Sequence, residues 1–250
     1  MSMKEIEISI AAEPIFHIGS FPVTNTLLMS WIVMAILIVF ALVVNRRLKL
    51  HPGKIQNAFE MVVEYIWDFM AEMLESKKLA KRFFPLIATL FLFIWVANMI
   101  EFTPGIGSVV IHEEGHSAAI PLLRSMNTDL NVTVALAIVA FLVIEVSGFL
   151  LLGFFKYGSK FINFGSPMKF FIGLIEMVSE LGRLLSFSFR LFGNIFAGEV
   201  LIVVIAAFVP FFLPIPFMAF ELFVGTIQAA IFALLTLSFI KIAITPVEHH

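Results

Sequence analysis

The longest apolar stretch of the chain constrains its fold more than any other feature. From Phe170 to Val209 apolar character persists for 40 residues, and no charged loop divides it. A helix of that length rises about 60 Å at 1.5 Å per residue, about twice the hydrocarbon thickness of a bilayer. The segment PFFLPIP follows at 210–216, and a second apolar stretch covers 217–242. The sequence therefore predicts a long tilted helix over 170–209 that turns at the prolines into a return helix over 217–242.

Three further apolar runs have the length of membrane spans, at 27–44, 83–100 and 130–155. The 250-residue chain is 60% hydrophobic and 14% charged, which is too apolar for a water-soluble domain. It contains no cysteine, so disulfides and thiolate metal sites are excluded. We therefore expect an all-α polytopic membrane protein, a single membrane domain over 1–250 with about five membrane-embedded helices.

The distribution of basic residues predicts the orientation of these spans. Basic clusters follow the first span, precede the second and follow the third; their members are Arg46, Arg47, Lys49, Lys54, Lys77, Lys78, Lys81, Arg82, Lys156, Lys160 and Lys169. The loop 101–129 has one basic residue, Arg124, against four acids. Because cytoplasmic loops are enriched in Lys and Arg, we expect loop 101–129 and the N-terminal segment 1–26 outside and the C-terminus in the cytoplasm.

Residues 55–75 have the pattern of an amphipathic helix rather than a span. Apolar residues recur at helical spacing, while five acids share the opposite face: Glu60, Glu64, Asp68, Glu72 and Glu75. We expect this helix on the cytoplasmic surface. Anionic headgroups repel an acidic face, which favours a protein partner over lipid anchoring; a solvated face over a local core is the alternative.

The 170–209 stretch carries ionisable residues that are costly in a membrane and therefore suggest a function. On a helix, one polar stripe lies within about 40° of Arg190; its other members are Glu176, Ser179, Arg183, Ser186 and Asn194. Glu199 lies about 180° round the helix from Arg190. Arginine stays charged in proteins, so one face carries a fixed cation and another face carries a titratable acid.

The hairpin geometry predicts which residues of the two helices lie level. If the turn is centred near Pro210, Glu199 and Glu221 are at the same height, and Arg190 and Gln228 are nearly so. Two adjacent carboxyls cannot both ionise cheaply, and they readily share or relay a proton. We therefore predict a carboxyl pair toward the outer side and an Arg190–Gln228 pair near the midplane.

Two other signals leave their function open. Glu145 interrupts the span 130–155, where it must face protein or water, and it either conducts a proton or only forms a pair. His112, Glu113 and His116 match the H-E-x-x-H pattern of zinc proteases. Gly115 interrupts that pattern and no third ligand is evident, so an intramembrane zinc protease is the less favoured alternative function.

The segment RLFGN followed by AGE, from Arg190 to Glu199, resembles the signature of the a subunit of F-type ATP synthase. DLNVT at 129–133 resembles the start of a mid-chain helix in that family. The resemblance implies a proton-translocating stator with two offset half-channels, in which Arg190 faces the carboxylates of the c-subunit ring and Gln228 packs beside it. It places Glu199, Glu221 and Asn194 in the outer half-channel and Glu176 toward the inner one. Some members have His where this chain has Glu221.

Three further residues, Glu145, Ser186 and Arg183, are candidates for lining the half-channels. The resemblance also implies the c-subunit ring, the b subunits of the peripheral stalk and membrane lipid as partners, and a location in the bacterial inner membrane. It implies no nucleic acid, cofactor or bound metal, and no catalysis by this chain alone. H⁺ is the default coupling ion, with Na⁺ open. A stator of another motor type, or a structural scaffold, explains the charges less well.

Overall fold

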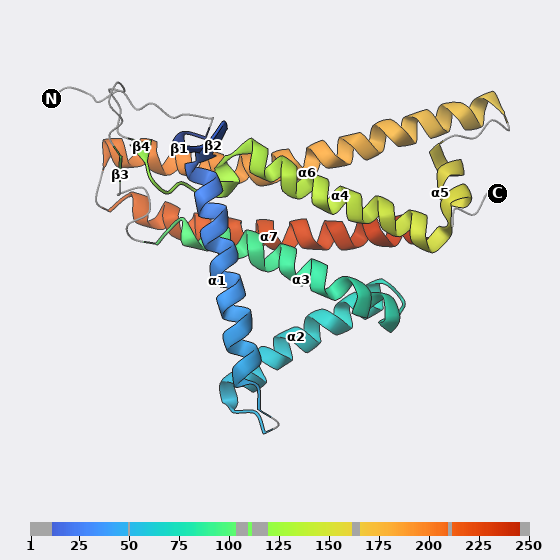
Figure 1. Ribbon diagram of the computed structural model, residues 1–250, viewed down its shortest axis with the longest axis horizontal. Helices are drawn as coiled ribbons and strands as arrows, with labels where there is room; N and C mark the ends of the chain where they lie inside the picture. The colour runs from blue at the N-terminus through green and yellow to red at the C-terminus, as the bar shows by residue number, and fades with distance from the viewer. Residues whose placement is uncertain are drawn as a thin grey trace.

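The computed structural model describes residues 12–49, 51–103, 110–111, 120–161, 166–209 and 212–245. Helices dominate this part of the chain: α1 (Asn25–Arg47), α2 (Lys54–Met73), α3 (Lys77–Ile100), α4 (Leu130–Leu152), α5 (Phe154–Phe161), α6 (Pro167–Phe208) and α7 (Pro214–Ile244). Five of them, α1, α3, α4, α6 and α7, are long and apolar enough to cross a membrane. The expected all-α polytopic membrane fold is confirmed (Figure 1).

Short polar side chains fix where several helices begin. A side-chain oxygen at the N-cap accepts a backbone N–H of the first turn, which satisfies a donor that has no partner inside the helix. Thr24 does this for α1, Ser76 for α3, Asp129 for α4 and Ser166 for α6. Pro167 follows Ser166 at the first position of α6, where its missing N–H costs nothing. These helix starts are therefore encoded locally.

The hairpin of α6 and α7 forms the long axis of the molecule (Figure 1). α6 continues through 42 residues without a break, and α7 continues through 31. α3, α4 and α6 all pack on α7. Their buried apolar side chains form one continuous layer near the middle of the hairpin, which includes Ile94, Ala140, Leu191 and Phe232. α7 is therefore the central helix of the bundle.

The structure shifts at least one end of every expected span, by up to six residues at the start of α3; α7, for example, begins at Pro214 rather than at residue 217. α3 begins at Lys77 rather than at residue 83, so the basic cluster 77–82 forms its first turns. α4 ends at Leu152, because Gly153 adopts a φ of 86°, a left-handed conformation that glycine tolerates and that stops the helix. Residues up to 155 had been expected in the same span, but 154 and 155 belong to the separate helix α5.

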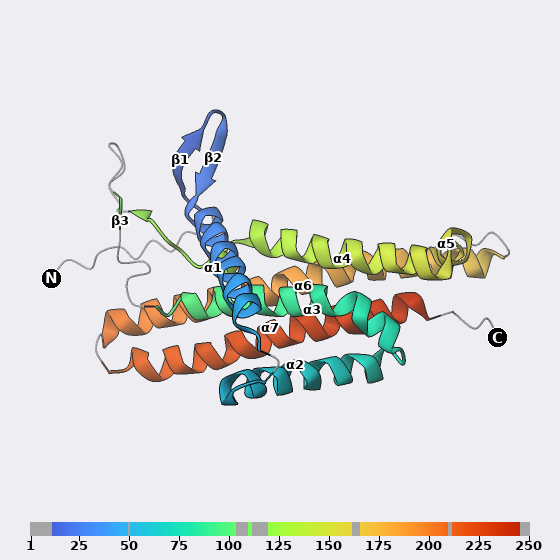
Figure 2. The ribbon, with the colours of Figure 1, turned by 60° about the horizontal axis from the view of Figure 1, so that its bottom comes forward.

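Two segments expected to be loops contain short strands. In the N-terminal segment β1 (Pro14–Ile18) and β2 (Phe21–Thr24) form an antiparallel hairpin, which projects from the bundle where α1 begins (Figure 2). In the loop between α3 and α4, β3 (Val110–Ile111) pairs with β4 (Ile120–Pro121), and a 3₁₀ turn, η1 (Met126–Thr128), precedes α4. Asn25 Nδ2 donates to the carbonyl of Pro121 at 3.3 Å, which ties the two segments together.

The amphipathic helix α2 packs beneath the bundle through a few apolar residues (Figure 2). Met70 and Leu74 are buried against side chains of α3 and α7. The acidic residues that share the opposite face are exposed, and one of them extends the contact: Lys241 Nζ of α7 donates to Glu75 Oε1 at 2.6 Å. The rest of the acidic face keeps its carboxylates exposed in this chain.

Candidate functional site

The acidic side chains of α6 belong to two separate polar clusters. The turn-side cluster, near the α6–α7 turn, contains Glu101, Arg124, Glu199 and Glu221; the far-side cluster contains Glu145, Tyr157, Glu176, Glu180 and Arg183. Arg190 lies between them on α6, seven residues after Arg183 and nine before Glu199. At 1.5 Å per residue these separations are about 10 and 13 Å along the helix. The two clusters therefore lie at different depths of the bundle.

An ion pair from a distant part of the chain fixes the carboxylate of Glu199. Arg124 Nη2 lies 3.5 Å from Glu199 Oε2, with the Arg124 side chain 9% exposed and that of Glu199 28% exposed. Arg124 comes from the segment before η1, which packs against α6. No local sequence pattern links Arg124 to Glu199, so the sequence indicates only the topological side on which Arg124 lies. The structure makes it the cation of the turn-side cluster.

The carboxyl group of Glu221 packs directly on the backbone of α6. Glu221 is 6% exposed, and its carboxyl fills the space that a Cβ on Gly198 would occupy. Glycine at 198 is therefore required for this approach. Gly198 precedes Glu199 in the sequence, so Glu221 lies at about the level of Glu199 on α6.

Glu101, which the sequence analysis missed, is the third acid of the turn-side cluster. It lies just beyond the end of α3. Its pKa is raised from 4.5 to about 8, chiefly by burial and also by the negative charges of Glu199 and Glu221; Ser125 and Arg124 act in the opposite direction. A carboxyl that titrates near neutral pH is suited to binding and releasing protons. In the sequence, Glu101 is marked only by being an acidic residue at the end of the predicted span 83–100.

Amides extend the turn-side cluster into the bundle. Asn98 Nδ2 donates to the carbonyl of Gly225 at 2.9 Å, and Asn127 Nδ2 donates to Asn98 Oδ1 at 2.6 Å. Asn194 Nδ2 donates to Gln228 Oε1 at 2.8 Å. Among the described residues, the buried atoms without a hydrogen-bond partner include Asn127 Oδ1, Glu221 Oε1 and Gln228 Nε2. Buried polar atoms of this kind are usually satisfied by water, so this region is suited to hold water molecules.

Gln228 differs from its expected pairing. The sequence analysis placed it beside Arg190, whereas the structure pairs it with Asn194, one helical turn nearer the α6–α7 turn. Asn194 lies 14 residues before Phe208, the end of α6, and Gln228 lies 14 residues after Pro214, the start of α7. With the turn centred at Pro210, Gln228 would lie level with Phe192; the observed helix ends centre the turn at position 211 and bring Asn194 level with Gln228, a shift of two residues.

Arg190 is exposed on the surface of the bundle. Its Nη2 donates to Ser186 Oγ at 3.3 Å, one turn earlier on the same helix. On the buried side of this part of α6, Phe187 and Leu191 lie in the apolar layer against α3, α4 and α7. Arg190 thus presents a permanent charge outward at the level where the interior is apolar.

The arginine of the far-side cluster forms ion pairs with two of its acids. Arg183 Nη1 lies 3.0 Å from Glu180 Oε2, and Arg183 Nη2 lies 3.2 Å from Glu176 Oε1. The Arg183 guanidinium also lies 5.0 Å from the ring centre of Phe239, a cation–π contact. Arg183 thus has two acids of its own helix as ion-pair partners, whereas Arg190 has none within the described part of the chain.

Glu145, whose role the sequence left open, joins the far-side cluster. Tyr157 of α5 donates its hydroxyl to Glu145 Oε2 at 3.1 Å. Tyr157 is buried, and this burial, together with the negative charge of Glu145, raises the pKa of the phenol. The ring also fits against Gly148, where a Cβ would collide with it. Glu145 therefore faces protein inside the bundle rather than lipid.

The H-E-x-x-H match at His112, Glu113 and His116 lies outside the described residues. Within the part of the chain that the structure describes, no three His, Cys, Asp or Glu side chains are grouped so as to hold a metal ion. None of the reported relatives is named as a protease. The zinc-protease alternative gains no support.

Fold and site together define a polytopic membrane protein in which polar clusters reach the interior of one long helical hairpin from both ends. The sequence profile described as "ATP synthase A chain" matches residues 27–241. The chain therefore belongs to the ATP synthase A chain family, as the resemblance at 190–199 had indicated.

Curated relatives agree with this assignment. "ATP synthase subunit a" of Moorella thermoacetica is 32% identical over 226 residues, which cover 90% of this chain and 93% of the relative. "ATP synthase subunit a" of Desulfotalea psychrophila is 36% identical over 213 residues, covering 83% and 79%. "ATP synthase subunit a, sodium ion specific" of Propionigenium modestum is 32% identical over 242 residues, covering 96% and 80%. The similarity extends over nearly the whole chain in each case.

Proposed function

We propose that this chain is the proton-translocating stator of an F-type ATP synthase membrane sector, with two offset half-channels that load and unload the carboxylates of the c-subunit ring. The observation that carries the proposal is the arrangement on α6. Two polar clusters lie at different depths, an apolar layer separates them inside the bundle, and Arg190 is exposed at the level between them. Protons entering at either end thus meet an apolar barrier within this chain and must cross on another subunit.

The turn-side cluster forms the outer half-channel in this proposal. Glu221 and Glu199 hold and relay the proton, because neighbouring carboxyls cannot both ionise cheaply. Glu101 adds a third titratable carboxyl. Asn194 and Gln228 continue the polar lining toward the level of Arg190.

The far-side cluster lies toward the inner half-channel. Glu176 is the candidate proton acceptor there, since its side chain is 31% exposed whereas that of Glu180 is 6% exposed. Arg183 forms ion pairs with Glu176 and Glu180, and it affects proton transfer only by way of these two acids. Glu145 with Tyr157, and Ser186 beside Arg190, are further candidates for the lining.

Arg190 acts as the barrier between the half-channels. Two half-channels that met directly would let protons leak down a gradient of about 2.3 kcal/mol per 100 mV. A permanent cation repels a directly crossing proton and favours the deprotonated form of each rotor carboxylate that passes. Its outward orientation gives it access to such a partner.

The remaining partners follow from this role. The c-subunit ring covers the Arg190 face, the b subunits of the peripheral stalk hold the chain against rotation, and lipid surrounds the rest. The chain itself catalyses no reaction.

We place the chain in the bacterial inner membrane with the N-terminus outside and the C-terminus in the cytoplasm, since its basic clusters share one side. Accessibility labelling of the two termini tests this orientation, which is overturned if both label from the same side.

Substitution of Arg190 tests the proposed function. Arg190→Ala should abolish proton-coupled ATP synthesis and ATP-driven pumping, while passive proton flux through the membrane sector stripped of its soluble motor stays the same or rises. Arg190→Lys keeps the charge but loses the planar fork, and we expect little coupled activity from it. Ser186→Ala, which removes only the hydroxyl that Arg190 contacts, is the control and should keep most of the activity. Pumping by Arg190→Ala near the wild-type rate would refute the barrier role.

A further inference from the structure

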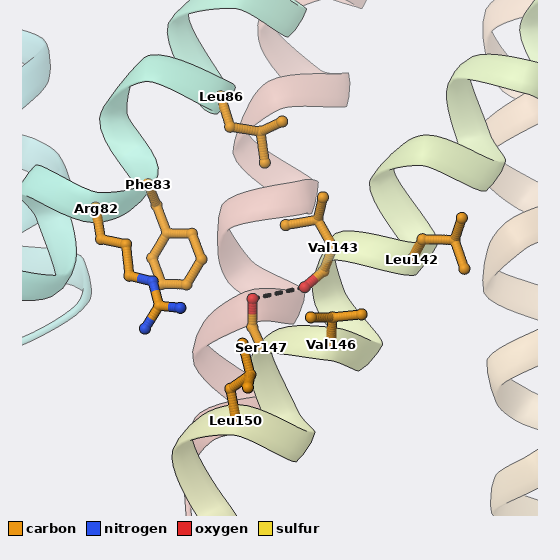
Figure 3. A pocket seen from close by; sticks show the side chains of 8 residues that line it. All are labelled: Arg82, Phe83, Leu86, Leu142, Val143, Val146, Ser147 and Leu150. Atoms are coloured by element: carbon orange, nitrogen blue, oxygen red, sulfur yellow. Dashed lines mark hydrogen bonds between the residues drawn. The ribbon is translucent and has the colours of Figure 1, made fainter.

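A groove on the outside of the bundle lies apart from both polar clusters. It runs between α3 and α4 and has a volume of about 330 Å³. Its walls are Arg82, Phe83 and Leu86 from α3 and chiefly Val143, Val146 and Leu150 from α4, with the ribbon of α7 behind them (Figure 3). The volume is at the lower end of the roughly 300–1,000 Å³ typical of ligand sites. The groove is therefore large enough for part of a small molecule or chain.

The groove is apolar along its length and polar at one end. On the α4 side Val146 is 51% and Leu150 62% exposed, whereas Phe83 is buried and forms part of the base. Ser147 uses its hydroxyl within α4, donating to the carbonyl of Val143 at 2.5 Å. Residues 142–150 extend for about 12 Å of helix. Such a surface fits a hydrocarbon chain and has no free hydrogen-bonding group along its walls.

Arg82 supplies the polar end. Its side chain is exposed, and no hydrogen bond or ion pair joins it to another residue in the described ranges. Three lysines of the first turns of α3 are also exposed at the same end: Lys77, Lys78 and Lys81. No acid lies within residues 77–82, so the first turns of α3 carry an excess of positive charge. The positive end of the helix dipole adds to it.

We propose that this groove binds one anionic phospholipid, with the headgroup phosphate on Arg82 and an acyl chain along the apolar walls between α3 and α4. The depth of Arg82 in the membrane matches that of a lipid headgroup, because Arg82 lies near the end of a membrane-spanning helix, where headgroups meet water. Arginine binds phosphate oxygens with two parallel N–H donors, whereas the lysines attract anionic lipid as point charges. The bound lipid fills the space that separates α3 from α4 at this end.

Photo-labelling in the assembled complex tests this proposal. Two probes with the same diazirine-bearing acyl chain, one phosphatidylglycerol and one phosphatidylcholine, are added separately to the complex in phosphatidylcholine nanodiscs. Mass spectrometry then measures labelling of the peptide that contains 142–150. We expect the anionic probe to label this peptide about tenfold more than the zwitterionic one, and excess inorganic phosphate not to displace it, because the acyl chain contributes to binding.

Matched variants distinguish a specific lipid site from a general attraction of anionic lipid to the basic end of α3. Arg82→Gln should remove the preference for the anionic probe, and Val146→Trp, which fills the groove, should reduce labelling by both probes. Lys81→Gln removes a neighbouring charge that does not line the groove, and should lower the preference by about fivefold at most. Equal labelling by the two probes, or a preference that survives Arg82→Gln, would overturn the proposal. Protection from both probes would overturn it too, because another polypeptide would then cover the groove.

Discussion

Arg124 and Glu199 form an ion pair across 75 residues of sequence, with 3.5 Å between Nη2 and Oε2. The pair joins the segment before α4 to the functional helix α6. It holds a fixed positive charge next to a titratable carboxylate and near Glu101, whose pKa Arg124 lowers. The electrostatics of the turn-side cluster therefore depend on a residue outside the hairpin.

Substitution of Arg124 is expected to change the pH dependence of coupling. Without the cation, the pKa of Glu101 rises further above its ordinary value, so deprotonation needs a higher pH. Arg124→Gln should lower ATP-driven pumping by about tenfold near neutral pH and shift its optimum to higher pH, and Arg124→Lys should restore part of both. Pumping measured from pH 6 to 9 in vesicles checks this.

The control for Arg124 is the exposed ion pair of Lys241 with Glu75, whose side chains are 35% and 79% exposed. Exposed pairs contribute about 0–1 kcal/mol, so Lys241→Gln should leave the pH optimum in place. An Arg124→Gln variant with a reduced rate but an unshifted optimum would limit Arg124 to a structural role.

Gly198→Ala tests whether Glu221 must lie against α6. The added methyl group would occupy the position of the Glu221 carboxyl, so we expect a loss of about 1–3 kcal/mol in stability and less assembled complex. Adding Glu221→Ala makes room again, and the double variant should assemble like the wild type but pump no better than Glu221→Ala alone. Immunodetection of the chain in purified complexes, with pumping assays, measures both effects. Normal assembly of Gly198→Ala would contradict this packing.

The acid pair itself is tested by titratable and non-titratable replacements. Replacing both Glu199 and Glu221 by Gln should reduce pumping severely without preventing assembly, because Gln keeps the shape but binds no proton. Glu221→His should retain more activity than Glu221→Ala, since a titratable group survives. Wild-type pumping in the double Gln variant would remove the pair from the pathway.

The raised pKa of Glu101 predicts how the stability of the chain varies with pH. Its folded-state pKa of about 8 lies above the ordinary 4.5, so between these values the folded state keeps a proton that the unfolded state has lost. Stability should therefore fall as pH rises from about 4.5 to about 8, and level off above. Glu101→Gln should flatten this decline and raise the melting temperature at pH 9.

Thermal denaturation in detergent between pH 5 and 9 measures the effect, with Glu75→Gln as control. The pKa of Glu75 is lowered by its hydrogen bond to Lys241, the opposite direction, and the side chain is exposed. Glu75→Gln should therefore leave the decline unchanged. A wild-type decline that persists in Glu101→Gln would show that another group causes it.

Much of this protein follows from its sequence alone. Continuous hydropathy indicates the spans, because a helix in lipid must satisfy its backbone internally and expose apolar side chains. The 100° spacing along α6 separates Arg190 from Glu199, and antiparallel pairing brings Glu199 and Glu221 to neighbouring positions. These features depend only on local helical spacing or on the single chain reversal between α6 and α7.

Tertiary structure decided what depends on distant contacts. The partner of Gln228 is Asn194 because the register of a hairpin depends on where both helices end, and an error of two residues changes the pairing. Arg124 and Glu101 reach the cluster from other segments, and Tyr157 reaches Glu145 only because Gly153 turns the chain back after α4. No periodic pattern in the sequence records such pairings, since each is created by packing of segments that are far apart along the chain.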